Sequence, residues 1–98
     1  MTRALNFKRE AEIDIQDAFD WYETRSDGLG TEFLRAVDAA LGNIVRNPLG
    51  YQIRLGSIRR APLRRFPYGM FFVVRDEDIV ITACLHSSRD PAHWQRRS

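Results

Sequence analysis

The spacing of hydrophobic residues changes near the middle of this chain, and that change limits its fold more than any other feature of the sequence. Before Pro48, two segments place apolar side chains three or four residues apart, as amphipathic helices do. The first stripe consists of Ala11, Ile15, Ala18, Phe19 and Tyr22, and the second of Phe33, Leu34, Val37, Leu41, Ile44 and Val45. Two helices in succession, followed by strand-like segments, indicate a fold in which both helices pack on a sheet.

A short turn separates the two predicted helices. Residues 26–30 include Gly28 and Gly30, and glycine readily adopts the left-handed conformation in which many helices end. The second helix should stop at Asn47, because the residue before a proline avoids the helical region. Since the connection is short, we expect the two helices to form an antiparallel hairpin.

The other segments have the short alternating or apolar patterns of strands. Residues 3–8 predict an opening strand with Leu5 and Phe7 on one face. Residues 50–55 and 57–66 interleave Ile and Leu with Arg, and we count them as one strand. Residues 69–75 and 79–86 are hydrophobic, so the three strands predict an antiparallel meander. The prediction is therefore a single α+β domain over residues 1–98, with the order β-α-α-β-β-β and an antiparallel-dominated sheet packed against a helical hairpin.

Several protein classes are excluded by what the chain lacks. The only cysteine, Cys84, cannot form an internal disulfide, so we expect it to pack as a small hydrophobic residue. Residues 1–15 are too charged for a signal peptide, and the longest apolar run, residues 70–74, is far shorter than the ~20 residues of a membrane helix. We expect a cytoplasmic protein with no membrane contact.

No cofactor or metal is expected. The Gly28-Leu29-Gly30 segment lacks the further glycine and the lysine of a phosphate-binding loop. Cys84, His86 and His93 do not have the paired spacing of a structural zinc site.

The formal net charge of +2 conceals an asymmetry along the chain. Residues 1–50 carry six basic and nine acidic side chains, whereas residues 51–98 carry nine basic and four acidic ones. Such segregation indicates either an anionic partner or contact between charged faces, although a solvated surface with segregated charges is the simpler explanation. All basic residues except Lys8 are arginine, which binds phosphate and carboxylate groups in a bidentate manner.

Arginine is concentrated in one predicted strand and the segment before it. Five arginines fall within twelve residues: Arg54, Arg59, Arg60, Arg64 and Arg65. If the segment is one strand, Arg59 and Arg65 share one face, while Arg60 and Arg64 share the other. This pattern suggests a surface that binds phosphate or carboxylate groups, or an edge strand protected from aggregation by charge.

His86 ends the last predicted strand, and Arg89 follows it closely. Imidazole can exchange protons near neutral pH, and arginine can stabilise the charge that develops on a phosphate during cleavage. Cleavage of RNA by its own 2′-hydroxyl is one hypothesis for this pair. The alternative is a histidine that holds the strand end or the following segment by a hydrogen bond.

The order of motifs along the chain resembles that of a known superfamily. The motifs are Trp21-Tyr22-Glu23, Gly28-Leu29-Gly30, Phe33, Asn47-Pro48, Ile58-Arg59-Arg60, Phe66-Pro67-Tyr68 and His86-Ser87-Ser88-Arg89-Asp90-Pro91-Ala92-His93-Trp94. Together they span roughly residues 3–94 and resemble the RelE/ParE superfamily of type II toxins, with the closest similarity to the ParE branch.

This resemblance implies a toxin held inactive by a cognate, ParD-like antitoxin in a hetero-oligomer. The antitoxin's C-terminal segment would fold around the toxin, and the five arginines would contact the antitoxin or the target. Members of the ParE branch inhibit DNA gyrase through a protein contact, which is the activity that we expect here.

The RelE branch supplies the alternative activity, ribosome-dependent cleavage of mRNA. Under that hypothesis His86 is the acid or base, and Arg65 and Arg89 stabilise the phosphate. The chain has no lysine after Lys8 and no tyrosine after Tyr68, so we expect no tyrosine near the last strand. A toxin that has lost its activity and only binds the antitoxin is a third hypothesis.

Overall fold

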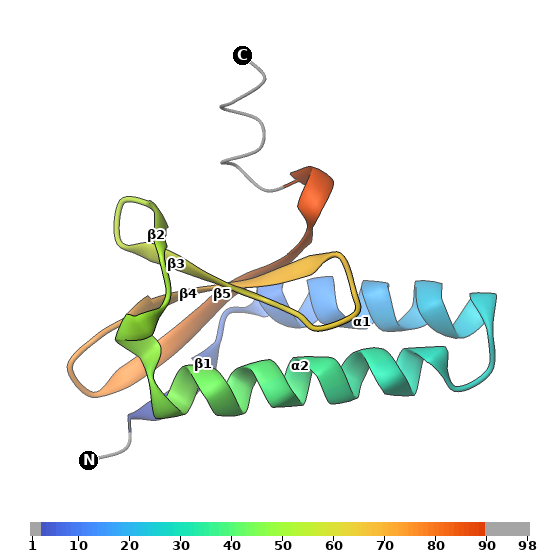
Figure 1. The fold of residues 1–98 in the computed structure, drawn as a ribbon, viewed down its shortest axis with the longest axis horizontal. Coiled ribbons are helices and arrows are strands. Elements are labelled where there is room, and N and C mark those ends of the chain that lie inside the picture. Colours follow the sequence, from blue (N-terminus) through green and yellow to red (C-terminus); the bar gives the residue numbers. More distant parts are fainter. Residues whose placement is uncertain (1–2, 90–98) are drawn as a thin grey trace.

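The computed structural model describes residues 3–89 and contains two long helices and five strands (Figure 1). In chain order the elements are β1 (Ala4–Phe7), α1 (Arg9–Arg25), α2 (Leu29–Arg46), the 3-10 turn η1 (Pro48–Gly50), β2 (Ile53–Leu55), β3 (Ile58–Pro62), β4 (Tyr68–Val74), β5 (Asp78–His86) and the 3-10 turn η2 (Ser87–Arg89). Within this range, neither helix is long and apolar enough to cross a membrane.

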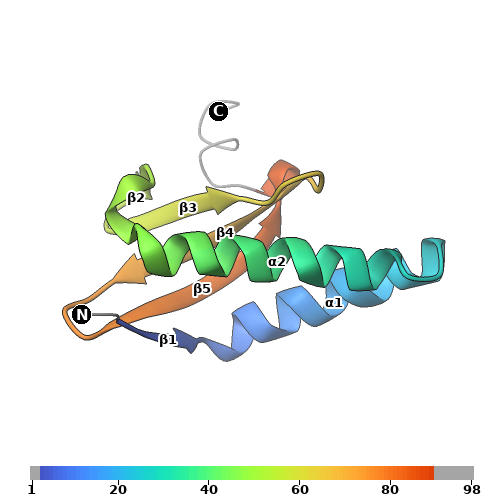
Figure 2. The same ribbon diagram turned by 60° about the horizontal axis from the view of Figure 1, so that its bottom comes forward.

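The strands form one sheet in the order β1-β5-β4-β3-β2, and both helices lie on the same face of it (Figure 2). Only β1 and β5 are parallel, while the other neighbours are antiparallel. The predicted α+β architecture and the antiparallel-dominated sheet are therefore confirmed. Residues buried below the helices form the core, and the largest of them are Phe33, Phe72, Ile44, Met70, Ile79 and Ile81.

The predicted helical hairpin is confirmed. Gly28 has a φ of 87° and separates α1 from α2, and α2 ends at Arg46, directly before Asn47 and Pro48. The two helices run antiparallel (Figure 1). The carboxylate of Glu23, near the end of α1, accepts hydrogen bonds from the backbone amides of Gly28 and Gly30, each at 2.9 Å. It thereby satisfies donors at the positive end of the α2 dipole.

The number of strands was predicted wrongly, because residues 50–55 and 57–66, which were counted as one strand, contain two strands, β2 and β3. Gly56, with a φ of 57°, allows a tight turn that folds β2 back onto β3. The predicted strand end at Phe66 is also wrong. β3 stops at Pro62, where the backbone leaves the sheet, and Arg65 adopts a left-handed conformation with a φ of 70°. Arg64 and Arg65 therefore lie in a loop.

A bulge in β5 decides which side chains of its second half face the helices. The register between β4 and β5 slips by one residue at Thr82, which has no partner in β4. Because side chains alternate along a strand, one extra residue reverses the faces. Ile79 and Ile81 face the helices before the bulge, and Cys84 and His86 face them after it. Without the slip, His86 would lie on the other face of the sheet.

Candidate functional site

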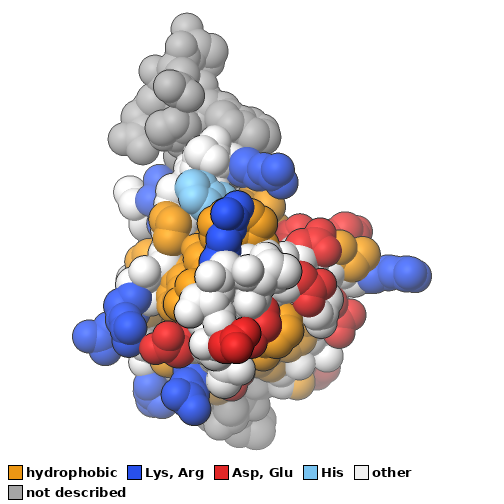
Figure 3. Space-filling model, turned by 90° about the vertical axis from the view of Figure 1, so that its right-hand side faces the viewer, with side chains coloured by type: hydrophobic (Ala, Val, Ile, Leu, Met, Phe, Trp, Pro, Cys, Tyr) orange, Lys and Arg blue, Asp and Glu red, His pale blue; other side chains and the backbone are white. Residues whose placement is uncertain are grey.

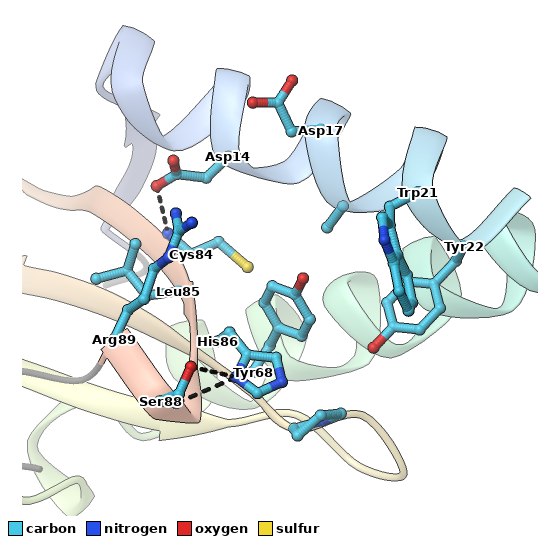
Figure 4. Close-up of a pocket in the computed structure, with 12 residues that line it drawn as sticks. Asp14, Asp17, Trp21, Tyr22, Tyr68, Cys84, Leu85, His86, Ser88 and Arg89 are labelled. Carbon is cyan, nitrogen blue, oxygen red and sulfur yellow. Dashed lines mark hydrogen bonds between the residues drawn. The ribbon is translucent and has the colours of Figure 1, made fainter. Parts of the chain in front are cut away.

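An open cleft of about 600 Å³ lies between α1 and the ends of β4 and β5 (Figure 4). It is lined by Asp14, Asp17, Ala18, Trp21, Tyr22, Pro67, Tyr68, Cys84, Leu85, His86, Ser88 and Arg89. Two of the residues proposed from the sequence, His86 and Arg89, are thus brought together. The helix supplies one wall and the sheet with η2 supplies the other.

Tyr68 and His86 lie side by side on the neighbouring strands β4 and β5. They are direct partners in the register of β4 and β5, and their rings stand edge to face with centroids 5.3 Å apart. The expectation that no tyrosine lies near the last strand is therefore wrong. The β4–β5 hairpin returns Tyr68 to the end of β5, although Tyr68 comes eighteen residues earlier in the chain. Pairing the two predicted strands as a hairpin would have placed Tyr68 opposite His86.

The ring of His86 is held by the residues that follow it. Its Nδ1 accepts a hydrogen bond from the backbone amide of Ser88 at 3.1 Å and lies 3.0 Å from the Ser88 hydroxyl. The amide and the hydroxyl of Ser87 both donate to the carbonyl of Pro67, at 2.8 and 3.1 Å. The two bonds of Ser87 fix the end of β5 to the loop before β4. The contacts between His86 and Ser88 are drawn in Figure 4.

The helix wall of the cleft is acidic and aromatic. Asp14 accepts a hydrogen bond of 3.0 Å from the backbone amide of Cys84, beyond the point where β1 stops pairing with β5. Asp17 is exposed beside it. Trp21 is 50% exposed, stands edge to face against Tyr22 with centroids 5.0 Å apart, and lies under the guanidinium of Arg25. This wall could not be predicted from the sequence, because its residues are far from β5 in the chain.

Burial keeps the neutral groups of the cleft neutral. Burial, together with the nearby Asp14 carboxylate, raises the pKa of the Cys84 thiol to about 12. Burial is also the main cause that raises the pKa of Tyr68 and of Tyr22 above the usual phenol range. Near pH 7 the thiol and both hydroxyls therefore stay protonated. The expectation that Cys84 packs as a small hydrophobic residue is confirmed, since it is 2% exposed.

Three of the five clustered arginines contact or flank their own sheet. Arg59 donates to the carbonyl of Tyr51 at 2.6 Å, which fixes the segment before β2. The guanidinium of Arg60 packs on the other face of the sheet, 5.9 Å from the ring centre of Phe71. Arg54 is half-buried in β2. None of these three lies in the cleft that contains His86.

The other two arginines line a second groove, of about 460 Å³, between α2 and the β3–β4 loop. We call it the arginine groove; it is lined by Glu32, Arg35, Ala36, Ala39, Arg64, Arg65 and Phe66. Arg65 forms an exposed ion pair of 3.6 Å with Glu32. Arg65 thus lies apart from His86 and Arg89, and the three residues of the nuclease hypothesis do not share one site.

The end of the molecule near the helical turn shows the two charge types side by side (Figure 3). Acidic side chains gather on the right of this view and several basic side chains lie at the lower left, with apolar side chains between them. Within residues 3–89, no group of three His, Cys, Asp or Glu side chains is arranged to hold a metal ion.

Comparisons with known proteins were consistent with each other. The sequence profile of one family, described as the ParE toxin of the type II toxin–antitoxin system parDE, matches residues 5–91. The fold is similar to a chain of the chromosomal ParDE system from P. aeruginosa, with a TM-score of 0.64, 20% identity, and coverage of 87% of this chain and 96% of that chain.

A second solved structure with this fold is the toxin–antitoxin complex RelBE2 from Mycobacterium tuberculosis. Its TM-score is 0.60 at 20% identity, and the alignment covers 88% of this chain and 99% of that chain. No curated protein sequence matches significantly.

Proposed function

Because this chain belongs to the family of ParE toxins of type II toxin–antitoxin systems, we propose that a cognate antitoxin neutralises it and that it inhibits DNA gyrase through a protein contact. The match covers nearly all of the described residues, including both helices and all five strands. The family alone does not choose between targets, since one fold supports different activities. The choice of gyrase is supported by the chemistry of the cleft.

The observation that carries this choice is the acidic wall of the cleft. A site that cleaves RNA has to attract phosphate groups, because phosphate contacts dominate the affinity for nucleic acids. Here Asp14 and Asp17 face the same cleft as Arg89, and Arg65 lies in the arginine groove instead. This mixture of charges, with exposed aromatic surface at Trp21, suits a protein surface better than an RNA backbone.

One observation favours the alternative, a ribosome-dependent mRNA endonuclease. Tyr68, His86 and Arg89 converge on the cleft, and histidine, tyrosine and arginine are side chains that can move protons and stabilise phosphate charge. Burial raises the pKa of Tyr68, so its phenol stays protonated near pH 7. Tyr68 therefore does not supply the base that an endonuclease needs.

The arginine groove is the antitoxin site that we propose. It offers Arg35, Arg64 and Arg65 around an apolar floor of Ala36, Ala39 and Phe66. Arg64 and Arg65 are exposed, and their guanidinium groups can form bidentate contacts with carboxylates. These features suit an acidic amphipathic segment that folds on binding. Arg59 and Arg60 are less available, because they already pack against their own chain.

Two purified assays run side by side test the proposed target. The toxin is added to gyrase in a supercoiling assay and to ribosomes translating a defined mRNA. We expect loss of supercoiling and intact mRNA. Cleavage of mRNA that disappears in a His86→Ala variant would establish the endonuclease in its place.

A further inference from the structure

The hydrogen bond between His86 and Ser88 determines where the neutral imidazole carries its proton. A backbone amide can only donate, so Nδ1 of His86 must present its lone pair to the Ser88 amide, 3.1 Å away. A neutral imidazole has one N–H and one acceptor nitrogen. With Nδ1 as the acceptor, the proton lies on Nε2.

The surroundings hold the ring in this orientation. Ser87 is bound to the Pro67 carbonyl through its amide and its hydroxyl, so the backbone that carries Ser88 cannot easily move away. The ring of Tyr68 stands edge to face with that of His86 on the neighbouring strand. Figure 4 shows the nitrogen on the far side of the His86 ring pointing away from Ser88 and into the cleft.

The Nε2 atom of His86 can act either as a hydrogen-bond donor or as a general base, but not as both in the same protonation state. A base needs a lone pair on the nitrogen that reaches the substrate, whereas this geometry places an N–H there. An N–H at a fixed position recognises an oxygen acceptor. The carboxylates of Asp14 and Asp17 on the opposite wall disfavour a phosphate as that acceptor, and the exposed ring of Trp21 offers apolar surface beside it.

We propose that Ser88 holds His86 in its Nε2–H form and that the cleft uses this proton to bind a carbonyl oxygen of the target protein. The proposal rests on the proposed function in one respect, that the target is a protein. His86 is then a recognition residue and Ser88 a positioning residue. The antitoxin, by contrast, is assigned to the arginine groove, so the two partners depend on different side chains.

Nitrogen NMR of the full chain tests the proton position without reference to any partner. With ¹⁵N-labelled histidine, and a His93→Gln variant to assign the signals, we expect an unprotonated Nδ1 and a protonated Nε2 for His86. Ser88→Ala keeps the backbone amide and should keep this pattern. Ser88→Pro removes the amide N–H and should yield a mixture of tautomers. A protonated Nδ1 in the neutral ring of the unmodified chain would overturn the proposal.

Two substitutions at His86 test the function of the donor. Asn can accept the Ser88 amide at the position of Nδ1 but has no group at the position of Nε2, whereas Gln places an amide N–H near that position. We expect His86→Asn to weaken gyrase inhibition by roughly tenfold, as the loss of one hydrogen bond does, and His86→Gln to restore it to within about threefold. Both variants should bind the antitoxin with unchanged affinity, which also shows that they fold.

Three results would contradict the recognition role: equal weakening by Asn and Gln, loss of antitoxin binding in both, or mRNA cleavage that depends on His86. If the unmodified chain does not inhibit gyrase at all, the proposed function fails, and with it the target part of this proposal. The NMR result then still decides the tautomer on its own, so the two failures are distinguishable.

Discussion

At the scale of single residues, burial and hydrogen bonding decide what each group of the cleft can do. The thiol of Cys84 and the hydroxyl of Tyr68 stay protonated near pH 7 because their pKa values are raised. His86 has a defined donor because one backbone amide occupies its other nitrogen. The charges that remain are those of Asp14, Asp17 and Arg89, and their mixture is what favours a protein partner.

The burial of Cys84 predicts a thiol that does not react in the folded protein. With a pKa of about 12, only about one thiol in ten thousand is ionised near pH 8, and the side chain is shielded from reagents. A disulfide reagent should therefore modify Cys84 only in denaturant. A Ser57→Cys variant supplies an exposed thiol as a control and should react at once. Rapid modification of the unaltered chain in buffer would contradict this account of the cleft floor.

Asp78 predicts an acid-sensitive contribution to stability. Hydrogen bonds from Arg75 and then from Asn6 lower the pKa of its carboxyl from 3.8 to about 2. The folded state thus binds this proton less readily than the unfolded chain. The carboxylate stabilises the fold above about pH 4, and this stabilisation is lost as the pH falls toward 2. Urea unfolding across that range should show a shallower pH dependence for Asp78→Asn than for the unmodified chain.

The neighbouring substitution Glu77→Gln is the matched control, since Glu77 is exposed in the same turn. Its pH dependence should follow that of the unmodified chain. Equal flattening by both substitutions would show that the turn's overall charge, and not the Asp78 bonds, governs acid stability.

At the scale of elements, local sequence patterns were enough to predict the helices but not where the strands end. Both helical stripes and the stop at Pro48 follow from side chains three or four residues apart, which is a local signal. The split of residues 50–66 depends on one turn at Gly56, and alternating Ile and Arg on both sides concealed it. The bulge at Thr82 has no local sequence signal, because it is set by pairing with β4.

The candidate cleft could be predicted only in part for the same reason. His86 and Arg89 are three residues apart, so the sequence placed them together. Asp14 meets the Cys84 amide across 70 residues of chain, and only the finished fold brings α1 beside β5. Arg59, Arg60, Arg64 and Arg65 were predicted to share one strand. The chain instead leaves the sheet at Pro62 and carries Arg64 and Arg65 to the helical side.

Two glycines of the hairpin predict opposite effects of the same substitution. Gly28 has a φ of 87°, where an L side chain is strained, so Gly28→Ala should lower the free energy of unfolding by about 1 kcal/mol. Gly42 lies inside α2, where an added Cβ would touch only the flexible end of Arg46. Gly42→Ala should raise stability by about 0.5–1 kcal/mol. Chemical denaturation measures both, and effects of the same sign would contradict the assigned turn.

At the scale of the whole molecule, charge is divided between two surfaces. The arginine groove beside α2 is basic, and the cleft beside α1 is of mixed charge. The sequence had suggested an acidic first half and a basic second half, but the fold places Arg35 of α2 with Arg64 and Arg65. The charge of each folded surface, and not that of each half of the sequence, therefore determines which partner it can bind. On this basis we assign the antitoxin to the arginine groove and the target to the cleft.

This division predicts which substitutions affect antitoxin binding. The double variant Arg64→Glu and Arg65→Glu should weaken binding to the cognate antitoxin by at least about tenfold at low salt, with a smaller effect at high salt. Arg9→Glu makes the same type of charge change outside the groove and should leave the affinity nearly unchanged. Calorimetry measures both. Equal loss in both variants would point to overall charge and not to the groove.

The measurement that tests the central claim most directly is a supercoiling titration of purified gyrase with the purified toxin. We predict that supercoiling stops as the toxin approaches gyrase in concentration and returns when the antitoxin is added. Normal supercoiling at a large excess of folded, antitoxin-binding toxin would contradict the claim that this chain acts on gyrase.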